Sequence, residues 1–256
     1  MTATPELFQF RSSHFNEKAR WALDFKRIPH VRHSLLPGPH RFRMQWLSGQ
    51  AMVPVLRDGA TVVAGSSQII THLEATRPDP PLVPTDPVHH RRAVELQNWF
   101  DDEIGPAVRL ALFHELFQAP DYLCRLFSWD QGPLVRMAFR AILPGVRLVI
   151  KAQYAVDAEN AVRAREKTCE ALDLVAREAG PDGYLVGDRF SVADLTAAAL
   201  LSPATNAPGC QVRHPEPWPP VLLAWWKAWE THPGVAWVKA TYRRHRGEAC
   251  EVAAAA

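Results

Sequence analysis

The residues best suited to chemistry in this 256-residue chain lie in the turn at 12–16, between an expected strand and an expected helix. The hydroxyl groups of Ser12 and Ser13 and the amide of Asn16 cluster where that helix should begin. Backbone N–H groups at a helix start have no partner within the helix, so they favour a thiolate, a carboxylate or a phosphate there. The turn contains no cysteine, which limits the chemistry that it can perform by itself.

Two further segments carry groups that could bind a ligand. Proline cannot donate to a strand ladder, so Val53-Pro54 at the start of a strand marks an edge strand or a cis turn. In the cis form the backbone of Val53 would face outward, where a peptide-like ligand could pair with it. Ser66-Ser67 opens a helix directly after a hairpin, and hydroxyl groups beside free N–H groups suit a carboxylate.

The elements that must position these groups alternate between strand and helix. Periodicity and turn residues predict the order β-α-β-α-β-β-α, which indicates a mixed sheet with helices on its faces. The expected segments are 6–10, 16–26, 30–35, 42–47, 53–57, 61–64 and 66–75, with a hairpin at Asp58-Gly59. Lys18 and Arg20 should lie along the exposed side of the first helix. We therefore expect an α/β domain over residues 1–78.

Prolines mark the boundary of that domain. Five of them fall within residues 77–87, and proline suppresses regular structure, so we expect a linker over 79–87. The remaining pattern predicts helices at 88–117, 121–129, 135–150, 160–178, 191–202, 219–230 and 235–242, the first of them kinked at Gly105-Pro106. An all-helical domain over 88–250 and a disordered tail over 251–256 complete the expected organisation.

Composition narrows the classes of function. Lysine and arginine number 29 against 27 acidic residues, and this balance gives no general reason to expect a nucleic acid or a membrane as partner. Four cysteines without close spacing fit a reducing, cytoplasmic compartment. The pairs His30/His33 and His89/His90 lack further metal ligands at a suitable spacing, so we expect no metal site.

This layout resembles that of the cytosolic glutathione S-transferases, in which a thioredoxin-like domain precedes an all-helical one. Three motifs carry the resemblance. Gly-Asp-Arg-Phe-Ser-Val-Ala-Asp at 187–194 matches the motif of the second domain, where Ser191 and Asp194 should form a capping box. Residues 53–56 match the strand with the cis proline, and residues 65–69 stand in the place of the acid-Ser-x-x-Ile motif.

The resemblance implies a role for the turn at 12–16. Ser13 aligns with the reactive cysteine of glutaredoxins and cysteine-type transferases, and in serine-type members a hydroxyl here hydrogen-bonds the sulfur of glutathione. Donors at a helix start favour the thiolate over the thiol. Ser12 is the alternative if the alignment shifts by one residue, and the Asn16 amide could also donate. Serine is also a common helix cap, so capping stays open as the simpler role.

The resemblance also implies the remaining binding residues and a homodimer, which is the usual assembly of this fold. For glutathione, the co-substrate, they are Gln50, Met52, Val53, Pro54, Ser66 and Ser67, with His40 a further candidate. For a hydrophobic co-substrate held between the domains they are His14, Phe15, Arg109, Phe113 and His114. Apolar stripes of this kind also form ordinary helix cores, so the sequence leaves the second set open.

Two departures from the family pattern bear on function. The missing cysteine argues against disulfide exchange through an enzyme thiol. Gly65 replaces the acid that normally helps to hold the γ-glutamyl ammonium, a loss of roughly 1.5–3 kcal/mol unless another acid such as Glu103 substitutes. The sequence favours a transferase that directs glutathione at a small hydrophobic electrophile. A glutathione-dependent isomerase or dehalogenase, and a non-catalytic binding or scaffold protein, are the alternatives.

Overall fold

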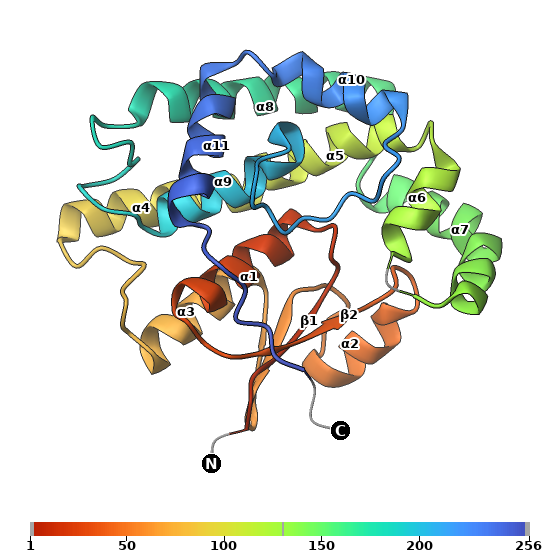
Figure 1. Ribbon diagram of the computed structural model, residues 1–256, viewed down its shortest axis with the longest axis horizontal. Helices are drawn as coiled ribbons and strands as arrows, with labels where there is room; N and C mark the ends of the chain where they lie inside the picture. Colours follow the sequence, from red (N-terminus) through yellow and green to blue (C-terminus); the bar gives the residue numbers. More distant parts are fainter. Residues whose placement is uncertain (1–2, 130, 254–256) are drawn as a thin grey trace.

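The computed structural model describes residues 3–129 and 131–253. The first part holds β1 (Glu6–Gln9), α1 (His14–Phe25), β2 (Val31–Ser34), α2 (His40–Ser48), β3 (Val55–Asp58), β4 (Thr61–Ala64) and α3 (Ser66–Thr76). The second holds α4 (Pro87–Trp99), the π-helical segment η1 (Phe100–Ile104), α5 (Gly105–Leu116), α6 (Pro120–Phe127), α7 (Pro133–Gln153), α8 (Ala158–Glu178), α9 (Val192–Thr205), α10 (Pro220–Trp229) and α11 (Pro233–His245). The predicted fold class, a thioredoxin-like domain followed by helices, is confirmed (Figure 1).

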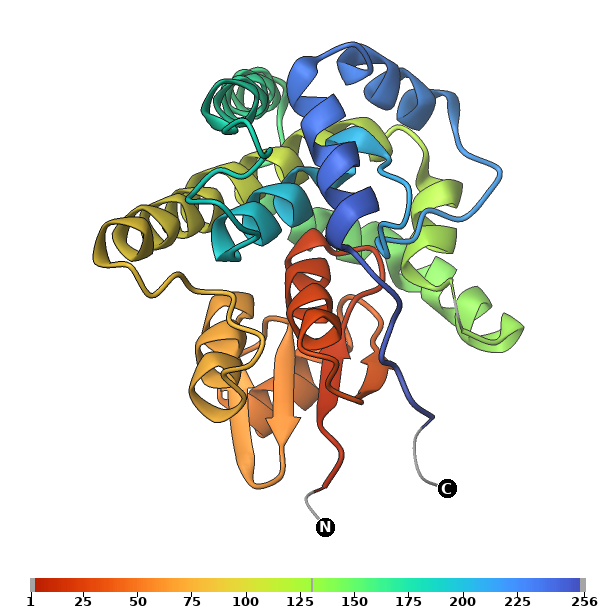
Figure 2. The same cartoon turned by 60° about the vertical axis from the view of Figure 1, so that its left-hand side comes forward.

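The sheet has the strand order β2-β1-β3-β4, with β1 parallel to β2 and antiparallel to β3. Successive side chains of a strand point to opposite faces of the sheet. Leu7 and Leu56 therefore join the core beneath α1 and α3, whereas Phe8 and Val55 pack with Met44 of α2 on the other face. The helical domain stacks on the α1 side, so that α1 is enclosed between the sheet and α9 (Figure 2).

Helix α9 forms the centre of the helical domain, and all of its 14 residues are buried. Its first turn is the predicted capping box. The hydroxyl of Ser191 accepts from the Ala193 N–H, and the Asp194 carboxylate accepts from the Ser191 N–H at 2.9 Å and from the Leu185 N–H at 2.8 Å. Burial raises the pKa of Asp194 to about 6, against the effect of these hydrogen bonds.

Helix α1 carries charged side chains into the space between the two domains. The prediction that Lys18 and Arg20 are exposed is wrong, because both side chains are fully buried. Polar spacing on a helix marks a polar face but does not reveal that a second domain covers that face. Arg20 donates to Glu17 at 2.8 Å and to Gln9 at 2.6 Å, and such partners offset the cost of burying a charge.

Arg246, directly after α11, completes this buried network. Its Nε lies 2.7 Å from a carboxylate oxygen of Glu17, and its Nη2 lies 2.9 Å from one of Asp24. Asp24 also pairs with Arg32 at 2.8 Å. Burial opposes ionisation of Glu17, but the charges of Arg246 and Arg20 outweigh it and hold the pKa of that carboxyl below its ordinary value. Residues far apart in the chain thus neutralise one another around α1.

The chain beyond α11 runs down past α1 to the sheet (Figures 1 and 2). There the His30 N–H donates to the carbonyl of Cys250 at 3.1 Å, and the Val252 N–H donates to the carbonyl of His30 at 2.9 Å. The expectation of a disordered tail over 251–256 is therefore wrong at its beginning, because this backbone is paired. Residues 254–256 lie outside the described part of the chain.

The helical stretch predicted at 88–117 is continuous, but it changes its winding. Between α4 and α5 the segment η1 forms a π-helical turn that ends immediately before Gly105-Pro106, where the sequence predicts a kink. Proline has no N–H to donate into the preceding turn, and single π-turns often occur at functional sites. This turn decides which acidic side chains face the first domain.

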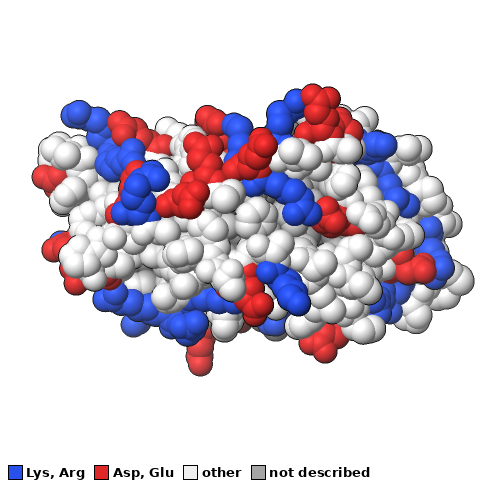
Figure 3. Space-filling model, turned by 90° about the horizontal axis from the view of Figure 1, so that it is seen from above, with Lys and Arg blue, Asp and Glu red and all other residues white. Residues whose placement is uncertain are grey.

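The outer face of the helical domain carries basic and acidic groups side by side (Figure 3). This mixture agrees with the nearly balanced composition of the chain. Among the helices of the described residues, none combines the length and the apolar character that crossing a membrane requires.

Replacing Arg246 by alanine should lower the free energy of unfolding by about 3 kcal/mol, because Glu17 and Asp24 each lose a cationic partner in a buried setting. Urea denaturation followed by circular dichroism measures the loss. Arg243→Ala is the matched control, since it removes the same charge from an exposed position of α11 and should cost less than about 0.5 kcal/mol. Equal costs for the two variants would contradict the role of Arg246.

Candidate functional site

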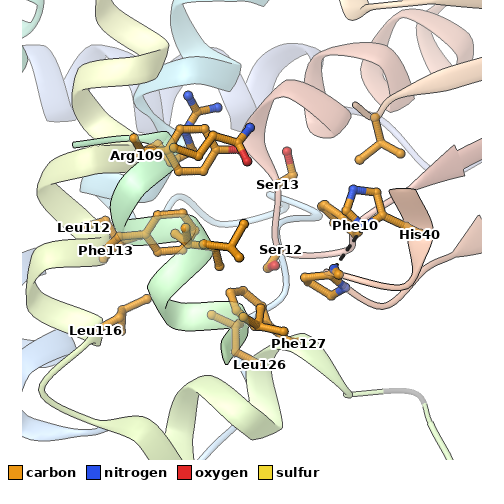
Figure 4. A pocket seen from close by; sticks show the side chains of 18 of the residues that line it. Phe10, Ser12, Ser13, His40, Arg109, Leu112, Phe113, Leu116, Leu126 and Phe127 are labelled. Atoms are coloured by element: carbon orange, nitrogen blue, oxygen red, sulfur yellow. Dashed lines mark hydrogen bonds between the residues drawn. The ribbon is translucent and has the colours of Figure 1, made fainter. Parts of the chain in front are cut away.

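A cavity of about 600 Å³ lies between the two domains, beside the turn that opens α1. Figure 4 shows Ser12 and Ser13 in its middle, with Phe10 and His40 on one side. The opposite wall is apolar and comes from α5, α6 and α7. It includes Leu112, Phe113, Leu116, Leu126 and Phe127 of α5 and α6, and Ile142, Val146, Val149 and Ile150 of α7. The cavity therefore joins a polar helix start to a hydrophobic surface.

Ser13 both caps α1 and lines the cavity. Its Oγ accepts a long hydrogen bond from the Asn16 N–H at 3.4 Å. A hydroxyl can donate and accept at the same time, so the proton of Ser13 is available to an acceptor in the cavity. Ser12 lines the cavity too, and its hydroxyl has no hydrogen-bond partner among the described residues. Capping and ligand binding are therefore compatible roles for this turn.

Asn16 occupies a different environment from the two serines. It is fully buried and lines neither this cavity nor the one described next. Its amide nitrogen and oxygen have no hydrogen-bond partner within residues 3–129 and 131–253. The structure thus brings Ser12 and Ser13 together at the cavity but does not bring the Asn16 amide there.

His14 fixes the start of α1 against α5. Its Nε2 donates to the carbonyl of Gly105 at 3.0 Å, since a carbonyl oxygen can only accept. Burial, and then the charge of Arg109, lower the pKa of His14 to about 3, against the effect of the bond to Gly105. The imidazole is therefore neutral at pH 7. Glycine is needed at 105 because a Cβ there would stand 2.6 Å from the ring of Phe15.

A second cavity, of about 320 Å³, adjoins the first. Phe15, Met52, Val53 and Arg109 line both, so the two cavities adjoin along these residues. The Val53–Pro54 bond is cis, in agreement with one of the two forms considered from the sequence. Val53 precedes β3 and its backbone has no partner in the sheet.

The two serines that open α3 are not equivalent. The Oγ of Ser67 accepts from Lys18 at 2.6 Å and from Gln97 at 2.8 Å, and it donates to Asp101. All the hydrogen bonds of its hydroxyl are therefore made within the protein. Ser66 lines the second cavity and has no side-chain hydrogen bond among the described residues. Of the pair, Ser66 offers its hydroxyl to a ligand.

Segment η1 brings two carboxylates, Asp101 and Asp102, to the second cavity. Asp101 pairs with Lys18 at 2.7 Å, and burial lowers the pKa of Lys18 to about 8 against the pull of that carboxylate. Asp102 is exposed and forms no ion pair within the described part of the chain. Glu103, the substitute acid considered from the sequence, instead pairs with Lys167. In the sequence, the run of three acids at 101–103 is the only indication of a carboxylate near this cavity. The π-helical turn then determines which of the three line it.

The glycine at 65 fits its backbone. Gly65 has a φ of 98°, in the region that favours glycine over every residue with a Cβ. A side chain there would also clash with the amide of Gln68, which turns back over this position. The space that a side chain at 65 would enter is thus occupied by the amide of Gln68.

Three other predicted residues lie apart from the core of the site or at its margin. Gln50 lines neither cavity, because its amide bonds to the backbone of Met52 at 2.8 and 2.5 Å. His114 lines neither cavity and contacts Glu115 at 3.3 Å. His40 lines the larger cavity, where burial and a neighbouring arginine lower its pKa to about 4.

One group of potential metal ligands lies close together among the described residues, namely Cys169, Asp173 and His232. None of them lines either cavity. His232 uses Nδ1 to accept from the Gly234 N–H at the start of α11, and its Nε2 lies 3.3 Å from Asp173. The contacts of this group are accounted for by a helix cap and a contact between His232 and Asp173.

Comparison with known proteins bears on this architecture. A family model described as "Glutathione S-transferase, N-terminal domain" matches residues 7–81, and one described as "Glutathione S-transferase, C-terminal domain" matches residues 136–233. Among curated proteins, FtsZ-localized protein A of Caulobacter vibrioides is 27% identical over 206 residues. That alignment covers 79% of this chain and 78% of the relative.

Solved structures agree on the fold. A glutathione S-transferase from Rhodospirillum rubrum superposes with a TM-score of 0.62 at 18% identity, over 96% of this chain and 89% of that one. One from Methylobacterium radiotolerans, in complex with glutathione sulfonate, superposes with a TM-score of 0.60 at 21% identity, over 98% and 99% of the two chains. At these identities the likeness concerns the fold.

Acidification should destabilise the protein below pH 6.5, because His14 protonates in the unfolded chain but stays neutral in the folded one. With a folded pKa of about 3, its contribution is complete above pH 6.5 and is lost as the pH falls toward 3. Between pH 6.5 and 5 the loss is roughly 1.5 kcal/mol for this group alone.

Urea denaturation at these two pH values measures that loss in the wild type and in His14→Gln. Glutamine can still donate to the Gly105 carbonyl but does not titrate, so its stability should change less with pH. An identical pH dependence in the two proteins would refute a neutral, buried His14.

Proposed function

This chain belongs to the glutathione S-transferase superfamily, and from that premise we propose that it binds glutathione and activates the thiol for attack on a small hydrophobic electrophile. One observation carries the proposal. The two adjoining cavities share Phe15 and Val53, so an extended tripeptide beside Val53 would reach from the start of α3 to the start of α1. The apolar wall of the larger cavity leaves room for an electrophile beside the thiol.

Both charged groups on the α-carbon of the γ-glutamyl residue have a candidate partner in the second cavity. Ser66, together with the free N–H groups at the start of α3, would hold the carboxylate. The exposed carboxylate of Asp102 would take the ammonium in place of the acid that Gly65 lacks. Val53 would pair its backbone with the cysteinyl part, with Met52 and Pro54 beside it. In this arrangement Ser67 only positions the start of α3, through its bond to Lys18.

The sulfur of glutathione would lie at the start of α1. The proposed donor is the hydroxyl of Ser13, whose proton is not used by its capping bond to Asn16. The first N–H groups of α1 add to the positive end of the helix. Donors that are fixed before the thiol ionises stabilise the thiolate without reorganising, and this lowers the barrier to nucleophilic attack.

Glutathione should bind the wild type, and Ser13→Ala should raise the pKa of its bound thiol by roughly 1–2 units, since a hydrogen bond to a charged group contributes about 1.5–3 kcal/mol. The ultraviolet absorbance of the thiolate, followed against pH in the complex, measures this shift. Ser12→Ala is the matched control and should leave the thiol pKa unchanged.

Two results would count against this proposal. If Ser12→Ala raises the thiol pKa and Ser13→Ala does not, the donor is Ser12. If calorimetry detects no binding at millimolar glutathione, the transferase function fails altogether.

The reaction that follows thiolate formation distinguishes the related enzyme classes. A stable glutathione conjugate supports the transferase, whereas an isomerised or dehalogenated product with glutathione released or oxidised supports the alternatives.

We further propose a cytoplasmic homodimer. Its support is the usual assembly of the family and four cysteines that form no disulfide among the described residues. Light scattering after size-exclusion chromatography tests the assembly.

A second candidate function is non-catalytic binding of a partner protein through α2 and α7. These helices approach each other where Arg41 contacts Gln153 at 3.5 Å. They expose large apolar side chains, namely Phe42, Trp46, Leu134, Met137 and Leu148. Residues 131–156, which include α7, hold four basic residues and no acid, so a partner with acidic character fits this face. The relative named FtsZ-localized protein A makes FtsZ the partner to test.

If this candidate holds, the wild type should cosediment with polymerised FtsZ. Trp46→Ala should weaken the binding about tenfold, because exposed aromatic side chains of this kind dominate protein interfaces. Val162→Ala, at an exposed apolar position of α8, should leave binding unchanged. Wild-type protein that stays in the supernatant would eliminate this function.

A further inference from the structure

Arg109 of α5 is a cation without an anionic partner. It forms no ion pair and no hydrogen bond among the described residues, and its Nε is buried without an acceptor. Burial lowers the pKa of Arg109, but a guanidinium keeps its proton in proteins. Burying a charge without a hydrogen-bonded counterion is costly, so this side chain presents donors that the protein itself does not use.

Aromatic rings hold the guanidinium in place. Its central carbon lies 4.0 Å from the ring centre of Tyr154 and 5.5 Å from that of Phe15. Cation–π contacts of this kind stabilise the charge and restrict the side chain, but a ring face supplies no oxygen or nitrogen to accept an N–H. Arg109 is therefore positioned, while its N–H groups stay available to a ligand.

The surrounding cavity favours an anion. The residues that line the larger cavity include no aspartate and no glutamate. Its three histidines, His14, His40 and His214, are all neutral at pH 7, because burial lowers their pKa values to about 3, 4 and 4. Arg109 and the exposed Arg41 at the cavity's edge are the charged side chains among the lining residues. A negative group that enters the larger cavity meets no carboxylate among its lining residues, because Asp101 and Asp102 line the adjoining cavity instead.

The wall opposite Ser12 and Ser13 is apolar. Leu112, Phe113 and Leu116 follow Arg109 along α5, and Leu126 and Phe127 face them from α6 (Figure 4). We infer that the cavity takes an apolar carboxylate, with the carboxylate on Arg109 and the hydrophobic body along α5 and α6. This inference rests on the proposed function in one respect only, which is that the electrophile of the transferase reaction would occupy the same cavity.

Calorimetry with a matched pair of probes tests this inference. The probes are 4-phenylbutanoate and its primary amide, which share a shape and differ in charge. The wild type should bind the carboxylate at least about tenfold more tightly, as expected for a charge-assisted hydrogen bond. Arg109→Gln should reduce that preference to less than about twofold. Arg91→Gln, which removes a charge from an exposed position of α4, should retain it.

The outcomes separate this inference from the transferase proposal. Equal affinity for the two probes in the wild type, or no binding of either, overturns the apolar carboxylate. A preference that survives Arg109→Gln also overturns it. If the wild type prefers the carboxylate but does not bind glutathione, the inference stands and the transferase fails. If Arg109→Gln abolishes glutathione binding and spares the probe preference, Arg109 serves glutathione instead.

Discussion

The geometry of both cavities depends on neutralising the charges that α1 buries. A buried ion is stable only with well-placed counterions, and those of α1 come from α1 itself, from β2, from η1 and from the residue after α11. Lys18 needs Asp101, and Glu17 needs Arg246. Because these partners stand on different elements, satisfying all of them fixes how the helical domain sits on the sheet. The space between the domains, and therefore the site, takes its shape from these pairs.

The order of the elements was predictable because its signals are local. The hairpin, the capping box around Asp194 and the helix start at Ser13 each depend on residues close in sequence, and the structure has each of them. The burial of Lys18 and Arg20 was not predictable in this way. Their spacing describes a polar face, and only the packing of α9 over α1, with Asp101 of η1 and Arg246 after α11 as partners, turns that face inward.

The residues of the site show the same difference between local and long-range signals. Ser13, Val53 and Ser66 stand where local motifs suggest, and all three line the cavities. Ser67 looks equivalent to Ser66 in the sequence, yet its hydroxyl is bound by Lys18, which is 49 residues away. Asp102 comes from a π-helical turn that no motif announces. Long-range pairing and irregular winding therefore decide which of several similar polar residues a ligand meets.

The pairing of Arg246 also has a consequence for biosynthesis. This arginine is translated 229 residues after Glu17 and 222 residues after Asp24. At roughly 5–20 residues per second, a ribosome needs on the order of tens of seconds to supply it. During that interval α1 leaves the exit tunnel with Arg20 and Arg32 available to its carboxylates but without Arg246, the partner that Glu17 and Asp24 share. The sheet domain of the nascent chain can therefore reach its final packing only after α11 has been synthesised, although it comes first in the sequence.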